Sequence, residues 1–166
     1  FVKLFKWIGE NMGGNPEVGS IEVQKLRPTA KIPSKAHNTD AGFDLYADRA
    51  YDIEMGHTML ISTGISMAIP RGYAGMIWDR SSMGVKGLHR FAGVIDSDYR
   101  GEIKVCIHNA SGDHYKIAEG DKVAQLVIQY VPSFFLREVD TLEETERGNK
   151  GFGSSCLLYT SPSPRD

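Results

Sequence analysis

The sequence predicts an all-β domain of the sandwich or jelly-roll kind, and three observations support this fold class. Short apolar or alternating runs recur at close spacing and are separated by turn residues. No stretch between residues 20 and 139 keeps a long 3.6-residue apolar period, so we expect at most one short helix. The length of 166 residues, with 41% hydrophobic residues, suffices for one buried core.

The runs differ in how deeply they are expected to be buried. Ile103, Val105 and Ile107 alternate with less apolar residues, which is typical of a half-buried strand. Residues 123–128 are almost continuously apolar and indicate a more buried strand. A short helix is expected near residues 81–85. The expected strands are centred, in chain order, on residues 21–26, 59–61, 65–69, 103–107 and 123–128.

The two ends of the chain differ from this body. Residues 1–19 contain a Gly-Gly-Asn-Pro run and are expected to be a loose, non-native leader, with Met12 as a candidate native start. Residues 20–139 form the expected β domain. Residues 140–155 combine an acidic connector with a Gly-rich segment and are expected to be a mobile arm. Residues 156–166 have no strand or helix period and are expected to be a non-native tail.

Composition excludes several classes of function. The formal net charge of −2 argues against a nucleic-acid partner. No apolar run approaches the roughly 20 residues of a membrane span, so no membrane association is expected. Two cysteines, Cys106 and Cys156, cannot form a disulfide framework, which favours a reducing compartment and a cytoplasmic location. The five histidines are scattered, so a zinc site is not expected.

The Gly-rich segment from Arg147 to Ser155 is the most informative part of the sequence. Its glycines free the backbone to turn amide N–H groups toward an anion, and its cations and serine hydroxyls could bind a polyphosphate. Phe152 lies between glycines, where a flat ring could close over a base. The segment misses the Walker A pattern because Ser154 stands where a lysine is required. Taken by itself, the same composition is typical of a disordered tail.

Two other segments carry groups that suit a nucleotide. Arg80, Ser81, Ser82 and Lys86 gather a guanidinium, two hydroxyls and an ammonium, although a surface loop with an N-cap serine is the simpler interpretation. The turn at residues 93–102 carries carboxylates and an aromatic ring between two strands. Its simpler interpretation is a hairpin whose side chains bond their own backbone.

Two buried polar groups also need partners. Asp44 lies between apolar neighbours on an expected strand, so an inward-facing carboxylate there requires a cation or hydrogen-bond donors. Gln125 lies within an apolar strand, and its amide likewise requires a partner.

These five segments, in this order, resemble the five motifs of the deoxyuridine triphosphatase (dUTPase) family. Each motif is weak by itself, but five in order with compatible spacing are specific. The resemblance extends from about Ile21 to Ser155. The matching positions are Ala41-Gly42-x-Asp44-Leu45, Arg80-Ser81, Gly93-x-Ile95-Asp96-x-Asp98-Tyr99-x-Gly101, Gly120-x-x-x-Ala124-Gln125 and Arg147-Gly148-x-x-Gly151-Phe152-Gly153-Ser154.

The resemblance implies hydrolysis of dUTP to dUMP and pyrophosphate by in-line attack of water on the α-phosphorus. Asp96 aligns with the carboxylate that orients and deprotonates this water. Tyr99 aligns with the ring packed under deoxyribose, where a ribose 2′-OH would clash. Main-chain groups of the hairpin at Gly93 and Ile95 would bind the uracil edge.

The resemblance also implies the remaining parts of the site. Arg80, Ser81, Ser82 and Gln125 align with phosphate contacts. Asp44 aligns with a carboxylate that holds Mg²⁺ through water. Phe152 would stack on uracil, while Arg147, Gly153 and Ser154 close over the phosphates as a lid. A single-length chain of this kind resembles the homotrimeric branch, whose sites lie between subunits.

Some positions depart from the family pattern. Asp79 stands where proline is frequent, and we expect its carboxylate to face away from the phosphates. Lys150 stands where glycine is frequent, and residues 90–92 occupy a stretch that varies widely in the family. One alternative is a dCTP deaminase, which shares the fold, but the Thr-Leu-Glu string at 141–143 comes too late in the chain for its catalytic glutamate. The other alternative is a dUTPase-like nucleotide-binding regulatory protein.

Overall fold

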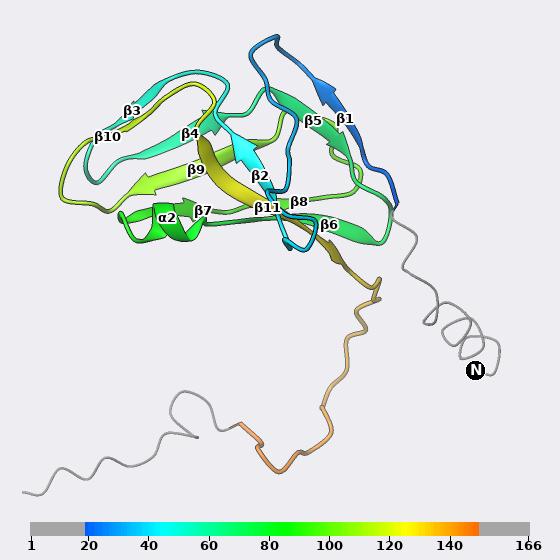
Figure 1. The fold of residues 1–166 in the computed structure, drawn as a ribbon. Helices are drawn as coiled ribbons and strands as arrows, with labels where there is room; N and C mark the ends of the chain where they lie inside the picture. Colours follow the sequence, from blue (N-terminus) through cyan, green and yellow to red (C-terminus); the bar gives the residue numbers. More distant parts are fainter. Residues whose placement is uncertain (1–18, 150–166) are drawn as a thin grey trace, which may run out of the picture. The chain divides into compact units, whose positions relative to one another are not determined.

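The computed structural model describes residues 19–149, and within this part the chain is nearly all β (Figure 1). Every strand pair is antiparallel. The predicted short helix is confirmed as α2 (Ser81–Gly84). The strands are β1 (Glu22–Lys25), β2 (Phe43–Tyr46), β3 (Tyr51–Ile53), β4 (Thr58–Ser62), β5 (Ile65–Ala68), β6 (Tyr73–Trp78), β7 (Leu88–Phe91), β8 (Val94–Ile95), β9 (Lys104–Asn109), β10 (Tyr115–Ile117) and β11 (Lys122–Tyr130).

The strands form two larger sheets and two small ones. The larger sheets have the orders β2-β11-β6-β8 and β4-β9-β7, and the small ones pair β1 with β5 and β10 with β3. The strands β4 and β5 follow each other in the chain but belong to different sheets, because the chain turns at Thr63 and Gly64. Such crossings between sheets are typical of the jelly-roll architecture that the sequence predicts.

The core is formed by the alternating inward-facing side chains of these sheets. On β9, Val105 and Ile107 are buried while Lys104 is exposed, which confirms the predicted half-buried strand. On β11, burial is more continuous from Val123 to Leu126, as predicted. The large apolar side chains with almost no exposed surface are Leu45, Ile53, Ile61, Ile65, Leu88, Ile103, Val105, Ile107 and Leu126.

The compact β unit ends at Ser133, and the chain from Phe134 onward is a separate unit. Residues 134–149 contain neither strand nor helix and are exposed. The expected leader, apart from residue 19, and the expected tail at 156–166 lie outside the described residues. Within residues 19–149, no helix combines the length and the apolar character needed to cross a membrane.

Candidate active site

Three of the five sequence segments meet at one cavity of about 300 Å³, which we call the cationic pocket. The loop before β2, the beginning of α2 and the strand β11 line it. The structure therefore brings residues together that are far apart in the sequence. The predicted site residues that line this pocket are Asp44, Arg80, Ser81, Ser82 and Gln125.

Asp44 is held in this pocket by two cations. Its Oδ1 lies 3.0 Å from Arg80 Nε, and its Oδ2 lies 2.7 Å from Lys122 Nζ. Its side chain is only 14% exposed, so these ion pairs offset the loss of hydration that burial of a carboxylate costs. The sequence predicts a cation or hydrogen-bond donors for Asp44, and Arg80 and Lys122 supply them. Lys122 was not predicted, because it comes to Asp44 only through the pairing of β11 with β2.

Gln125 stabilises the backbone beside the same pocket. Its Nε2 donates a hydrogen bond of 2.9 Å to the main-chain carbonyl of Asp79, which supplies the partner that the sequence requires. Gly42 makes room for this amide, since a Cβ at that position would lie 3.0 Å from Gln125 Oε1. Gln125 thus links β11 to the main chain just before Arg80 and holds the backbone from which the Arg80 side chain extends.

The carboxylate of Asp79 is engaged on the other side of this segment. Its Oδ1 accepts a hydrogen bond of 2.7 Å from the main-chain N–H of Arg90, and its Oδ2 lies 3.2 Å from His89 Nδ1. Asp79 is not among the residues that line the cationic pocket. Its negative charge is therefore directed to β7 and not to the pocket, in agreement with the expectation that this carboxylate faces away.

The serines at the beginning of α2 are exposed at the pocket. The hydroxyls of Ser81 and Ser82 make no hydrogen bond within residues 19–149, so they are available as donors. An adjoining cavity of about 390 Å³ shares Arg80, Ser82 and Lys122 with the cationic pocket and adds Lys86. The ammonium of Lys86 lies 3.2 Å from the Tyr115 hydroxyl. The combined surface carries the three cations of Arg80, Lys86 and Lys122 together with the carboxylates of Asp40, Asp44 and Asp121.

A second cavity, of about 310 Å³, lies at the turn that follows β8, and we call it the turn pocket. Ile95, Asp96 and Tyr99 line it together with Glu102 and Lys104, whereas Gly93 is not among its lining residues. Asp96 is exposed, and its carboxylate has no hydrogen bond or ion pair within the described part of the chain. The Tyr99 hydroxyl donates to the main-chain carbonyl of Glu102 at 3.1 Å.

The two pockets lie toward opposite ends of β6. Ile95 pairs with Gly75 near the beginning of this strand, whereas Arg80 follows its end at Trp78. A strand rises about 10 Å between Gly75 and Trp78, and Asp96 and Arg80 lie further out in opposite directions. The two cavities have no lining residue in common. One copy of the chain therefore does not bring Asp96 together with Arg80.

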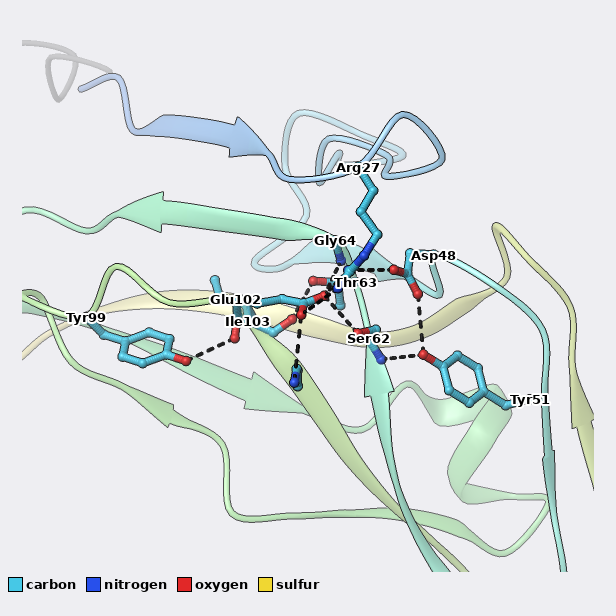
Figure 2. Close-up of polar contacts among 10 residues, drawn as sticks. Arg27, Asp48, Tyr51, Ser62, Thr63, Gly64, Tyr99, Glu102 and Ile103 are labelled. Carbon is cyan, nitrogen blue, oxygen red and sulfur yellow. Dashed lines mark hydrogen bonds and ion pairs between the residues drawn. The ribbon is translucent and has the colours of Figure 1, made fainter.

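A charged cluster of Arg27, Asp48 and Glu102, which reaches the turn pocket at Glu102, was not predicted from the sequence (Figure 2). Arg27 Nη1 lies 2.5 Å from Glu102 Oε1 and 2.7 Å from Asp48 Oδ2. Hydrogen bonds from Arg27, together with Ser62 and the Gly64 amide, lower the pKa of Glu102 from 4.5 to about 2 despite its burial. The hydrogen bond to Glu102 also raises the pKa of Arg27.

The fifth segment is described only at its beginning. Residues 145–148 form a turn in which the Gly148 amide donates to the Thr145 carbonyl at 2.9 Å. Arg147 is described and exposed, whereas Lys150, Phe152, Gly153 and Ser154 lie outside the described residues.

The donor set suits a hydrated magnesium ion better than a directly bound metal. Within residues 19–149, no group of three or more His, Cys, Asp or Glu side chains could hold a metal ion. The cationic pocket contains two carboxylates, those of Asp40 and Asp44. Magnesium is commonly bound by one or two carboxylates, retained waters and the phosphates of a substrate. Asp44 therefore fits a contact through water and not a protein-made cage.

The fold and the two pockets define an all-β protein with one pocket of cations, hydroxyls and carboxylates and a separate, exposed carboxylate beside an aromatic ring. A family model described as dUTPase matches residues 28–156. The chain belongs to the dUTPase family.

Curated relatives carry the same family name across distant organisms. The chain is 42% identical over 139 residues to the deoxyuridine 5'-triphosphate nucleotidohydrolase of Corynebacterium diphtheriae, covering 81% of this chain and 91% of that protein. It is 40% identical over 141 residues to the protein of that name from Fowlpox virus, covering 82% and 97%.

Solved structures give the same result for the fold. The Staphylococcus bacteriophage 80alpha dUTPase with dUpNHpp has a TM-score of 0.80 and 28% identity, over 84% of this chain and all of that one. A mutant dUTPase from phage phi11 of S. aureus, described with the coordination of a structural Mg(II) ion, has a TM-score of 0.70 and 29% identity, over 74% and 98%.

Proposed function

We propose that this chain hydrolyses dUTP to dUMP and pyrophosphate. The family match over residues 28–156 is the observation that carries this conclusion. The relatives named deoxyuridine 5'-triphosphate nucleotidohydrolase are covered over nine tenths or more of their length in the two cases given above. The chain also has the cations and hydroxyls that a triphosphate requires and an exposed carboxylate that could accept a proton.

In this proposal Asp96 is the general base. It orients the attacking water and takes its proton as the oxygen approaches the α-phosphorus in line with the departing pyrophosphate. The exposed carboxylate, with no partner within the described residues, supports this role because it is not already occupied by a cation.

The phosphates are bound in the cationic pocket. Arg80 supplies the guanidinium fork, Ser81 and Ser82 supply hydroxyls, and Gln125 fixes the segment that carries Arg80. Asp44 would hold Mg²⁺ through water, and the bound ion would neutralise charge on the phosphate oxygens. The position of Lys122 beside Asp44 supports a further phosphate contact that the sequence did not predict.

The nucleoside lies in the turn pocket. The ring of Tyr99 packs under deoxyribose and excludes a 2′-hydroxyl, and the main chain of Gly93 and Ile95 binds the uracil edge. The cavity at Ile95, Asp96 and Tyr99 supports this assignment because it places the proposed base and the sugar-packing ring side by side.

The functional unit is a homotrimer with sites between subunits. The separation of Asp96 and Arg80 along β6 supports this, since a complete site needs the turn pocket of one copy and the cationic pocket of another. The C-terminal arm of residues 147–155 completes the site as a lid, in which Arg147, Gly153 and Ser154 bind phosphates and Phe152 stacks on uracil.

A pyrophosphate-release assay tests this function. The protein with Mg²⁺ should release pyrophosphate from dUTP and give little release from dCTP or dTTP. Ammonia released from dCTP would instead indicate a deaminase. Tight binding of dUpNHpp without any turnover of dUTP would indicate a nucleotide-binding regulatory protein and overturn the proposal.

A further inference from the structure

The turn between Asp96 and Gly101 is attached to the β domain at its two ends by different means. At its beginning, Ile95 pairs with Gly75 in an ordinary antiparallel ladder. After its end, β9 begins only at Lys104, so residues 102 and 103 lie outside the strand pairing of β9. What fixes the second end of the turn must therefore be a set of individual contacts.

Those contacts come from the carboxylate of Glu102. Its Oε1 accepts hydrogen bonds from Arg27 Nη1 at 2.5 Å, from Ser62 Oγ at 2.8 Å and from the Gly64 amide at 2.9 Å. Its Oε2 accepts a further one from Arg27 Nη2 at 3.2 Å. The side chain is 12% exposed, so these bonds are poorly replaced by water.

The next residue is bound to the same segment of chain. The Ile103 amide donates to the Ile65 carbonyl at 2.9 Å, and the Thr63 hydroxyl donates to the Ile103 carbonyl at 2.5 Å. Figure 2 shows the side chains of Arg27, Ser62 and Glu102 converging at this point. Residues 102 and 103 are thus bound to residues 62–65 by both side-chain and main-chain hydrogen bonds.

Arg27 is itself fixed by a second buried anion. Its Nη1 lies 2.7 Å from Asp48 Oδ2, and the Asp48 side chain has no exposed surface. Tyr51 donates to Asp48 Oδ1 at 3.3 Å and accepts a hydrogen bond from the Ser62 amide at 2.8 Å. The guanidinium is therefore preorganised to receive Glu102, and it bridges chain segments 75 residues apart.

This anchor reaches the turn pocket through Tyr99. The Tyr99 hydroxyl donates to the main-chain carbonyl of Glu102, and the ring lies directly over Gly101. A Cβ on Gly101 would collide with that hydroxyl oxygen and with the ring. The height and tilt of the ring therefore follow from where the backbone of residues 101 and 102 is held.

We propose that Arg27 and Glu102 are positioning residues for the nucleoside pocket: their ion pair fixes the end of the Asp96–Gly101 turn and thereby the ring of Tyr99. The proposal rests on the proposed function, because the ring excludes the 2′-hydroxyl only if the turn pocket binds deoxyribose. Arg27 does not line the turn pocket, and Glu102 lines its edge while its carboxylate is turned to Arg27, Ser62 and Gly64. Arg27 and Glu102 act by holding the wall that sets the choice between deoxyribose and ribose.

The first test compares dUTP with UTP in Glu102→Gln, which keeps the shape of the side chain but removes its charge. We expect kcat/KM for dUTP to fall about tenfold to 10²-fold, as is common when a contact surface shifts by about 1 Å. The ratio of kcat/KM for dUTP to that for UTP should fall about tenfold. Arg27→Lys, which keeps a cation but loses the two-pronged contact, should give an intermediate ratio. An unchanged ratio in Glu102→Gln would overturn the proposal.

A control variant tests whether a loss of stability alone lowers the dUTP/UTP ratio of kcat/KM. Ile53→Val removes one methylene from the core on β3, away from the turn, and should lower the melting temperature while leaving the dUTP/UTP ratio unchanged. If Ile53→Val lowers the ratio as much as Glu102→Gln does, the effect is general destabilisation and the proposal is wrong.

A second readout needs no enzymatic activity. Hydrogen exchange of the unliganded protein should show faster exchange at the Tyr99 and Ile103 amides in Glu102→Gln than in the parent and in Ile53→Val. Equal exchange in all three proteins would refute the anchor. Faster exchange in a protein that does not turn over dUTP would leave the anchor standing and reject the proposed function.

Discussion

Asp44 and Asp96 are both carboxylates assigned to the site, yet their surroundings are opposite. Asp44 is 14% exposed and lies between Arg80 and Lys122, within 3.0 Å of each. Asp96 is exposed on a turn, and none of the groups described in residues 19–149 pairs with it. The first carboxylate is paired with two cations in a pocket that also contains Asp40, whereas the second is unpaired within these residues and lies beside the Tyr99 ring.

The two environments suit different chemical roles. Both oxygens of Asp44 are engaged by cations, so this carboxylate organises the charges around it. The carboxylate of Asp96 has no such partner within residues 19–149, which leaves its oxygens open to a substrate's water. Under the proposed function, electrostatic organisation belongs to the cationic pocket and proton transfer belongs to the turn pocket.

Asp96→Asn should give the largest effect. The amide keeps the shape of the side chain but cannot take a proton, so kcat should fall about 10²–10⁴-fold while the Kd for dUpNHpp changes little. Asp98→Asn, a carboxylate two residues further along the same turn, is the matched control and should retain most activity. A kcat for Asp96→Asn near that of the parent would remove the general-base role.

Asp44→Asn should change the dependence on magnesium. If the carboxylate orients the ion's waters, the apparent affinity for Mg²⁺ in the dUTP reaction should weaken about 10–100-fold. Binding of dUpNHpp without Mg²⁺ should not weaken, because the substitution removes a negative charge next to Arg80 and Lys122. Titration calorimetry with and without Mg²⁺ measures both effects. Weaker binding in the absence of Mg²⁺ would contradict the assigned role.

Tyr99→Ala should narrow the dUTP/UTP ratio of kcat/KM, because it removes the ring under the sugar. A loss of about 10–200-fold in discrimination is the usual range when one packing contact decides between substrates. Tyr99→Phe keeps the ring but loses the hydrogen bond that ties it to the Glu102 backbone, so it should lower the ratio less than Tyr99→Ala does and about as much as Glu102→Gln does. Similar ratios for the parent and Tyr99→Ala would assign the exclusion of ribose to another residue.

The pH dependence of stability should give the smallest effect. The hydrogen bond from Arg27 lowers the pKa of Glu102 from 4.5 to about 2, and hydrogen bonds from Ser62 and Gly64 add to this effect. The Lys104 ammonium also lies 3.8 Å from this carboxylate. A depressed pKa in the folded state stabilises the protein above pH 4.5, and this contribution is lost as the pH falls from 4.5 toward 2.

Thermal melting of the parent and of Glu102→Gln checks this sign. The parent should melt about 2–8 °C higher at pH 7, and the difference should shrink below about pH 4.5. A difference that grows with acidification would show that Glu102 is not stabilised as an anion in the folded state.

Local sequence patterns predicted the parts of the fold that depend on local periodicity. The alternation of Ile103, Val105 and Ile107 gave β9, and the serines before Met83 gave the position of α2. The prediction that Asp44 requires a cation or hydrogen-bond donors followed from its place between apolar neighbours, and Arg80 and Lys122 meet this requirement. By contrast β6 was not predicted, because Gly75 interrupts its apolar pattern.

The rest could not be predicted because it depends on pairs distant in the sequence. The contact of Arg27 with Glu102 spans 75 residues, and each residue taken by itself is typical of a solvated surface. Lys122 meets Asp44 only because β11 pairs with β2 in one particular register. The two pockets could be assigned residue by residue from the motifs, but their separation along β6 became visible only in three dimensions.

The placement of Arg80 and Asp96 beyond opposite ends of β6 also has a consequence for inheritance. Under the proposed intersubunit site, a chain that lacks Arg80 still offers an intact turn pocket, and one that lacks Asp96 still offers an intact cationic pocket. Two alleles that are each inactive could thus restore activity when they are expressed together, because mixed assemblies contain a complete site. By the same geometry, one defective allele also lowers the activity of the product of a healthy allele. Each altered chain contributes its defective residue to a site that it forms with a normal chain.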